Sequence, residues 1–352
     1  MKLSHEELRE KLSKEIEVVA GVLSELTDTC DKQVGHDWIE EERAVAERWR
    51  TPLARVAAVE YMAVKVCSIA MELVNSTKRI TVTKRAVFLL HARICRGARE
   101  VRLLLSHGYN LGAWSAMRTM YELHVLAWFI DKHGDDTAQR YLEHGVIDLR
   151  DWIGQMGKLA GEDVADVIRG DTERLKQLDD RLRELGDTYG PKYLKKYGWA
   201  NSALRPDNSK YEASFKDIDD DVGPSPLRPL YEMACAAVHG SSYASHMGSD
   251  LVPSANMLLV GSSPLDLGAP AIGCIRVLQQ QVAVLVDAWD ENDDVRHLII
   301  ATHIALTDFV NDTAEILIEA DDRLRDFDAR NREHGQFTFT EEESPWGDKP
   351  EL

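Results

Sequence analysis

The sequence lacks the cysteine pairs that mark zinc knuckles and redox centres. Its five cysteines lie far apart, and no C-x-x-C pair occurs among them. Most of them stand beside apolar residues, which predicts free, buried thiols of the kind found in a reducing cytosol. We therefore expect a cytoplasmic protein with no metal site and no cofactor.

Long apolar runs are also missing. No run approaches the roughly 18–20 residues that a helix needs to span a bilayer. The N-terminal stretch MKLSHEELREKLSKEIEVV is charged throughout and has no apolar segment typical of a signal peptide. The sequence therefore predicts no association with a membrane.

Positive charge is scarce. Lysine and arginine number 42 against 60 aspartates and glutamates, which gives a formal net charge of −18. A surface of this kind repels phosphate backbones at long range, so we expect no generic coating of DNA or RNA. Basic patches confined to part of the surface remain compatible with this charge.

The common catalytic motifs are absent as well. The sequence contains no G-x-x-x-x-G-K-[ST] phosphate loop, no H-E-x-x-H zinc motif and no G-x-S-x-G nucleophile elbow. No glutamate stands three positions before any of the 12 histidines, which excludes the Glu-x-x-His ligand pair of di-iron bundles. Any chemistry must therefore come from residues without a familiar motif.

Apolar residues recur almost everywhere at the spacing of an α-helix, and strand-like alternation is nearly absent. We therefore expect an all-α, multi-helix bundle of about eight to ten helices, with an irregular connector near 187–226 and another near 247–270. Residues 1–80 would form N-terminal helices that pack on a main bundle at 81–333, followed by an acidic tail at 334–352. The predicted helices are 4–30, 52–73, 83–107, 111–130, 137–156, 162–186, 227–239, 270–290 and 293–328.

The helix at 111–130 carries charge on an apolar face. Arg118 and Glu122 stand four residues apart, so they share one face of the helix. Charge on such a face must be paired or solvated, because isolated buried charge costs several kcal/mol. Two interpretations stay open: an ion pair that fixes helix register, or one wall of a polar cleft. The other residues of this stripe are Leu111, Trp114, Tyr121, Val125 and Phe129.

A second polar group stands at the head of the helix at 137–156. Arg140, Tyr141 and His144 lie close together there, and Arg140 and His144 share a face. They form either a surface cluster with a partly buried tyrosine or part of a binding site.

The stretch YEMACAAVHGSSYASH, from Tyr231 to His246, is the third candidate. In a helix beginning at Leu227, Tyr231 and His239 lie on one face at steps of four residues, next to a packing flank. We therefore expect His239 beside the core and facing Arg118 and Glu122, either as a capping histidine or as a general acid or base. The packing flank comprises Leu230, Ala234 and Val238.

The end of that helix is marked by small residues. Gly240 can terminate it in a left-handed conformation, and Ser241 or Ser242 can cap a new helix. The crowding of polar residues in this stretch is therefore partly a result of capping.

Three motifs together resemble a family of uncharacterised bacterial all-helical proteins. They are YNLGAWSAMRTMYELHVLAWFI, AQRYLEH and LYEMACAAVHGSS, and the resemblance covers about residues 85–290. That family shows an Arg-x-x-x-Glu on one helix, an Arg-Tyr on the next, and a tyrosine-bearing helix that ends in His-Gly-Ser. The resemblance implies no activity, but it singles out Arg118, Glu122, Arg140, Tyr141, Tyr231, His239 and Ser241.

A more distant resemblance links the chain to HEPN-type helical proteins, many of which are RNases of toxins or phage defence. Their signature is an arginine followed, after four to six residues, by a histidine. Four such spacings occur here, about as many as chance predicts for 12 histidines. His239 departs from the signature, because no arginine precedes it at the required offset.

These sequence features support two candidate functions of different classes. In the first, the protein is an effector of stress or phage defence that acts on RNA or a nucleotide. Arg118 or Arg140 would bind the anionic group, Glu122 would complete the site, and His239 would move a proton. Tyr141, Tyr231 and Ser241 would line the binding surface.

In the second function, the protein is a non-enzymatic sensor or assembly module, and the polar cluster is structural. Its partner would be a second copy, as in a homodimer, another protein, or a small anionic ligand. A small-molecule pocket beneath the 187–226 connector is a third alternative.

Overall fold

The all-α class that the sequence predicts is confirmed. The computed structural model describes residues 35–77, 80–159, 172–208, 210–239, 251–252, 257–258, 261–287 and 293–334. This part of the chain contains eleven α-helices, slightly more than expected, and two short 3-10 helices. The predicted helix at 4–30 and the tail after His334 lie outside the described residues.

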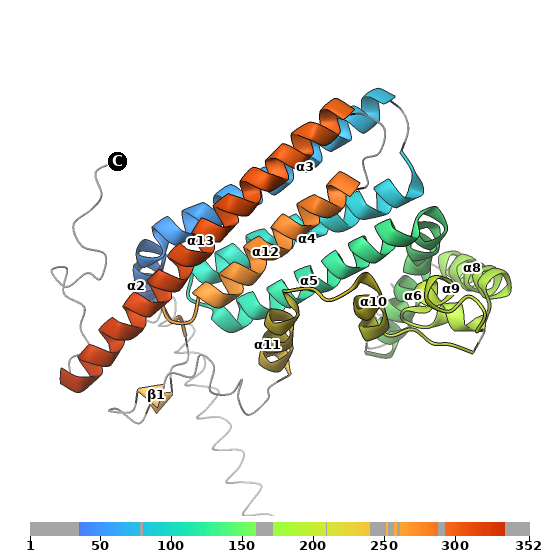
Figure 1. The fold of residues 1–352 in the computed structure, drawn as a ribbon. Helices are drawn as coiled ribbons and strands as arrows, with labels where there is room; N and C mark the ends of the chain where they lie inside the picture. The colour runs from blue at the N-terminus through green and yellow to red at the C-terminus, as the bar shows by residue number, and fades with distance from the viewer. Residues whose placement is uncertain are drawn as a thin grey trace, which may run out of the picture.

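Helices α4 (Val82–Ser106) and α5 (Asn110–His133) form an antiparallel pair at the centre of the molecule (Figure 1). The Thr81 hydroxyl caps α4 by accepting a hydrogen bond from the Lys84 backbone N–H. Gly108 turns the chain between the two helices with φ of +78°, and a Cβ there would lie 2.7 Å from the Ser263 nitrogen. The predicted core face of α4 is buried throughout: Val87, Leu90, Ile94, Ala98, Val101 and Leu105.

Three long helices cover this pair on one side. Helices α3 (Arg50–Thr77) and α13 (Asp293–His334) run antiparallel, and α12 (Gly268–Asp287) contacts both of them as well as α4 and α5 (Figure 1). Asp321 of α13 accepts hydrogen bonds from the backbone N–H groups of Leu267 and Gly268, at 3.2 and 2.8 Å. Its carboxylate thereby caps the N-terminus of α12. Helix α2 (Gly35–Arg48) packs against α3 and α4.

The far end of α5 carries the rest of the described chain. Helices α6 (Asp135–Leu159) and α8 (Thr172–Tyr189) pack together there, and the predicted connector follows as short helical pieces (Figure 1). Trp199 and Tyr193 anchor this connector and are 3% and 2% exposed. The pieces are η2 (Pro191–Leu194), η3 (Gly198–Ala200), α9 (Asn201–Leu204) and α10 (Phe215–Val222).

Helix α11 (Arg228–Val238) lies against α5, and a short strand pair falls within the second predicted connector. The antiparallel strands β1 (Leu251–Val252) and β2 (Met257–Leu258) have two residues each. Within the described residues, no helix is long and apolar enough to cross a bilayer.

His91 places a titratable group inside this core. It is 1% exposed on α4, and its Nε2 lies 3.0 Å from the Ala63 carbonyl oxygen of α3 and 3.2 Å from Cys95 Sγ. Burial lowers the pKa of His91 from 6.5 to about 4, although the Ala63 hydrogen bond partly opposes this shift.

We expect His91 to make the fold sensitive to acid. Between pH 6.5 and about 4 the unfolded chain protonates this imidazole and the folded chain does not, so stability falls as the pH drops. The full loss attributable to this residue is about 3 kcal/mol. In urea unfolding at pH 7, 5.5 and 4, His91→Gln should lose less stability than the wild type over this interval. The exposed His107 of the same helix provides the control, since His107→Gln should keep the wild-type slope. Equal slopes for all three proteins would contradict the assignment.

Candidate functional site

The predicted polar stripe on α5 divides into a buried part and an edge. Trp114, Tyr121, Val125 and Phe129 are 0–1% exposed and belong to the core. The side chains of Arg118 and Glu122 keep 24% and 32% of their surface exposed, and Arg118 Nε lies 3.1 Å from Glu122 Oε1. The i, i+4 ion pair expected from the sequence is therefore formed at the edge of the buried face.

Helix α11 adds Tyr231 to this pair. Pro229 lies in the first turn of α11, where its missing N–H is tolerated and its fixed φ suits a helix. The Tyr231 hydroxyl donates to Glu122 Oε1 at 3.2 Å, and the ring stacks on Tyr121 with centroids 4.6 Å apart. The Arg118 guanidinium lies 6.0 Å from the centre of the Tyr231 ring. Three of the predicted site residues thus converge from two helices.

The pKa shifts of Arg118 and Tyr231 hold each side chain in a single protonation state. Burial is the largest single cause and lowers the pKa of Arg118, but Glu122, Cys235 and Tyr231 together outweigh it, so the pKa lies above its ordinary value. Burial, followed by a hydrogen bond with Cys235 and the charge of Glu122, raises the pKa of Tyr231. The arginine therefore stays charged and the tyrosine neutral at physiological pH.

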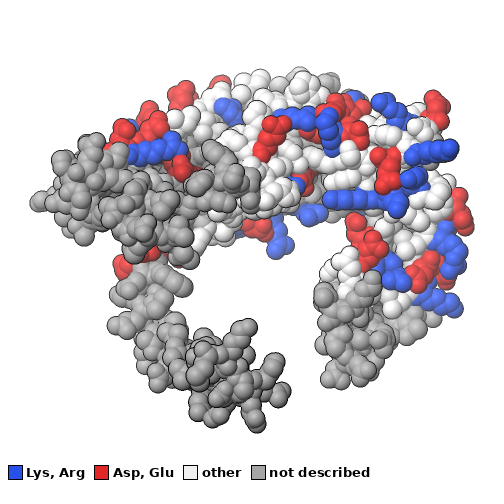
Figure 2. Space-filling model, turned by 90° about the horizontal axis from the view of Figure 1, so that it is seen from below, with Lys and Arg blue, Asp and Glu red and all other residues white. Residues whose placement is uncertain are grey.

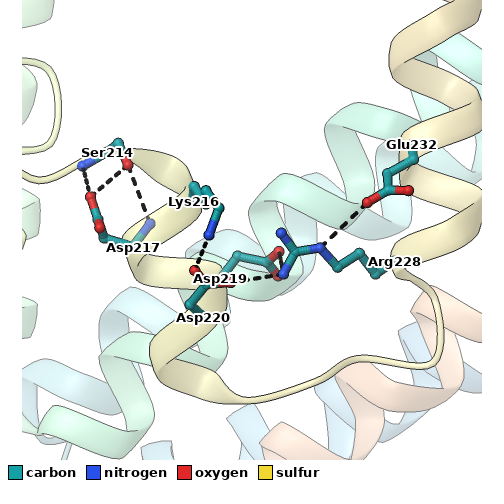
Figure 3. A network of polar contacts seen from close by, with 7 residues as sticks. All are labelled: Ser214, Lys216, Asp217, Asp219, Asp220, Arg228 and Glu232. Carbon is teal, nitrogen blue, oxygen red and sulfur yellow. Dashed lines mark hydrogen bonds and ion pairs between the residues drawn. The ribbon is translucent and has the colours of Figure 1, made fainter.

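A second, deeper network adjoins this one. Tyr121 is fully buried, and its hydroxyl donates to Asp219 Oδ1 of α10 at 2.8 Å. Arg228 at the start of α11 lies 3.3 Å from Asp219 Oδ2 and 2.8 Å from Asp220 Oδ1 (Figure 3). Burial and the hydrogen bond to Asp219 raise the pKa of Tyr121. This arginine gives the buried Asp219 carboxylate the partner that it requires.

No sequence pattern singled out Asp219 or Arg228 as site residues. A local signal existed nearby, because Ser214 and Asp217 form a capping box that starts α10 (Figure 3). The capping box predicts a helix but not the direction of its buried face. The two networks meet at the stacked rings of Tyr121 and Tyr231, and we call them together the polar seam. It comprises Arg118, Tyr121, Glu122, Asp219, Arg228 and Tyr231.

His239 does not join the polar seam. Its side chain is exposed, so the prediction that it lies beside the core was wrong. Helix α11 ends at Val238, which is itself 41% exposed, whereas Ala234 and Ala237 pack against the core, so the end of the helix presents Val238 and His239 to solvent. Among the described residues, no hydrogen bond or ion pair joins the His239 side chain to Arg118 or Glu122. Gly240 and Ser241 lie outside the described residues.

Arg140 and Tyr141 lie at another end of the molecule. Arg118 is 15 residues before the end of α5, which corresponds to about 22 Å along the helix axis. Arg140 instead pairs with Asp136 at 2.8 Å and lies 4.3 Å from the centre of the Tyr189 ring. Tyr141 packs edge-on against Trp199 at 5.0 Å. These two residues anchor the connector and take no part in the polar seam.

His144 belongs to the same anchoring group. It is 3% exposed, and its Nε2 lies 2.8 Å from the Lys195 carbonyl oxygen. Its neighbour Tyr193 donates to the Arg140 carbonyl oxygen at 2.7 Å. A surface cluster with a partly buried tyrosine therefore describes Arg140 and Tyr141, whereas His144 is more deeply buried than that interpretation assumed.

Two cavities in the described part of the chain lie away from the polar seam. One, of about 450 Å³, is an apolar groove between α3 and α13. The other, of about 480 Å³, lies between α3 and α4 and is lined by Glu60, Cys67, His91 and Cys95 among others. None of the residues that line either cavity belongs to the polar seam. The described residues hold no group of three or more His, Cys, Asp or Glu side chains arranged for a metal ion.

We expect the Tyr231 hydroxyl to hold α11 on α5. Tyr231→Phe keeps the stacked ring but removes the bond to Glu122, so it should lower the free energy of unfolding by about 1 kcal/mol in urea. Tyr197 is the matched control, because no hydrogen bond of its hydroxyl occurs within the described residues. Tyr197→Phe should change stability by only a few tenths of a kcal/mol. Equal losses in both variants would show that the bond to Glu122 has no special role.

Comparisons with known proteins place this site within one family match. No curated protein and no solved structure matches the chain. The resemblance to HEPN-type proteins is not confirmed. A family model does match residues 84–251, which extend from the start of α4 to β1 and include the polar seam. The match ends before residue 290, where the resemblance was expected to end. The family that this model describes is DUF5677, a family of unknown function.

Proposed function

We propose that this protein is a non-enzymatic helical assembly module in which the polar seam is structural. The observation that carries the proposal is the mutual pairing of the seam residues. Glu122 binds both Arg118 and Tyr231, while Asp219 binds both Tyr121 and Arg228. Groups already satisfied by each other hold helices in register and leave little capacity for a substrate.

The separation of His239 from Tyr231 along α11 supports a structural role for the polar seam over a catalytic one. His239 follows Tyr231 by eight residues, which corresponds to about 12 Å along α11. A reacting atom must lie within about 3 Å of each group that exchanges a proton with it. His239 therefore lies more than two helical turns from Tyr231, and no hydrogen bond or ion pair of the described residues joins it to the Glu122–Tyr231 pair.

The assembly surface that we propose is the outer face of α3 and α13. Tyr61 and Met62 on α3 are 60% and 39% exposed, and Ile304 on α13 is 58% exposed. Between them runs the apolar groove of about 450 Å³. A continuous apolar face of this kind typically marks an interaction site.

A second copy of the chain is the partner that this face suits best. Two antiparallel α3–α13 pairs related by a two-fold axis would form a four-helix arrangement and close both grooves. The exposed charges are complementary, since Lys65 stands on α3 and Asp308 on α13. The free thiols Cys67, Cys95, Cys235 and Cys274 support a reducing compartment, and we propose a cytoplasmic location.

An enzyme acting on RNA or a nucleotide, as in stress or phage defence, is the second candidate. It is favoured by the accessibility of two predicted residues: Arg118 keeps 24% of its side chain exposed, and His239 is exposed. In this alternative, Arg118 binds a phosphate and His239 moves a proton elsewhere on the same ligand. A small anionic ligand bound without turnover would use Arg118 in the same way.

Sedimentation should detect the proposed dimer. We expect the wild type to shift from monomer to dimer mass as its concentration rises, and Ile304→Lys to remain monomeric because it buries an unpaired charge in the interface. Trp152→Lys is the matched control, since Trp152 is 61% exposed on α6 and lies outside the proposed face. It should associate as the wild type does. A wild type that stays monomeric at every concentration would contradict assembly with a second copy.

Turnover assays separate the two candidate functions. The assembly proposal predicts that purified protein, Arg118→Ala and His239→Ala all leave RNA and nucleoside triphosphates intact, and that only Arg118→Ala unfolds at a lower temperature than the wild type. Chromatography of the products and thermal unfolding of each variant provide the measurement. Turnover that His239→Ala abolishes without lowering the melting temperature would overturn the assembly proposal in favour of an enzyme.

A further inference from the structure

The part of the connector from η2 to the first turn of α10 differs in charge from the rest of the molecule. Residues 191–216 carry six lysines and arginines but only two acidic residues, a net charge of +4 within a chain of −18. Figure 2 shows Lys and Arg side chains, with Asp and Glu side chains among them, toward the right-hand end of the molecule, where Figure 1 places α6 and α8–α10. The acidic character of the chain is therefore locally reversed.

Four of these cations are free for a partner. Lys192 pairs with Glu212 at 2.7 Å, and Lys216 pairs with Asp220. The other four cations are exposed, and no carboxylate of the described residues lies within ion-pair distance of any of them. The hydrogen bond from Lys192 is the main cause that lowers the pKa of Glu212. The charge of Lys195 is only a minor cause of this shift. The four are Lys195, Lys196, Arg205 and Lys210.

The backbone that presents these cations is held in place. Trp199 packs edge-on against Phe129 of α5, with ring centroids 5.7 Å apart. Asn201 ties the two ends of the connector together: its Nδ2 donates to the Lys192 carbonyl oxygen, and its Oδ1 accepts from the Ala213 N–H at 2.9 Å. Gly198 leaves no room for a side chain, because a Cβ would lie 2.3 Å from the Lys192 carbonyl oxygen. A surface fixed before binding loses less conformational entropy when a ligand arrives.

Aromatic residues are interleaved with the cations along this segment. Tyr197 and Tyr211 are half-buried, so part of each ring reaches solvent. The Lys196 ammonium lies 5.2 Å from the centre of the Tyr197 ring. Cations that follow a phosphate backbone, combined with rings on which bases stack, are typical of surfaces that bind single strands. An acidic peptide would use the cations but not the rings.

We propose that the 191–216 connector is a docking surface for single-stranded nucleic acid. Unpaired Lys195, Lys196, Arg205 and Lys210 contact phosphates, and Tyr197 and Tyr211 offer their rings to bases. The acidic remainder of the chain does not prevent this binding, because charges beyond about 8 Å are screened at physiological ionic strength. The inference goes beyond the assembly role and does not depend on it.

Fluorescence anisotropy of the full chain with labelled oligonucleotides of about 15 residues tests this surface. We expect single-stranded RNA or DNA of mixed sequence to bind, and comparison of the two shows whether the 2′-hydroxyl contributes. With four phosphate contacts, affinity should fall about 50-fold between 50 and 200 mM salt. A polyglutamate peptide of equal charge should bind much more weakly. Equal binding of that peptide would overturn the proposal in favour of an acidic protein partner.

The double variant Lys195→Gln/Lys196→Gln tests whether the oligonucleotide binds at this segment. It should weaken binding about tenfold and reduce the slope of log affinity against log salt by about 1.4. Arg43→Gln/Arg96→Gln removes the same charge from α2 and α4, where both side chains are exposed, and should leave affinity within about twofold. Circular dichroism confirms that both variants are folded. Absence of binding by the wild type, or equal losses in both variants, would overturn the proposal, and neither result bears on dimer formation.

Discussion

Helix α5 is surrounded by other helices, and this packing decides which residues its buried polar side chains must pair with. Twelve of its 24 residues are buried, and it contacts α4, α6, α10, α11 and α12. Polar groups on such a helix need partners from its neighbours, because unpaired polar groups in a core cost several kcal/mol. Tyr121 meets Asp219, His124 meets Gln281, and Glu122 meets Tyr231. Each pairing fixes the position of one neighbouring helix against α5.

The pairing that stabilises the fold also limits chemistry at the polar seam. A general acid or base needs a pKa near the working pH and a free path to substrate. Tyr231 and Arg118 have pKa values shifted away from neutrality, and their polar atoms face each other or Glu122. The surface therefore offers better candidates for function: an apolar face on α3 and α13, and a basic face on the connector.

These two surfaces lie on different parts of the fold and suit different partners. The α3–α13 face is apolar and belongs to helices outside the segment that matches the family model. The basic connector lies inside that segment and is anchored to α5 and α6 through Trp199. A module of this design could associate through one face while the other binds a polyanion, because neither interaction occludes the residues of the other.

The sequence by itself determined the helices, since apolar spacing at the helical period requires only local information. It also placed Arg118 and Glu122 on one helix face, because residues four apart share a face whatever the tertiary structure. Tertiary structure alone decided that Tyr231 completes this pair, that Asp219 and Arg228 belong beside it, and that Arg140 does not. His239 illustrates the reason. Its helical phase was predictable, but its exposure depends on which side of α11 packs against the core, and no local pattern encodes the relative placement of helices so far apart in the chain.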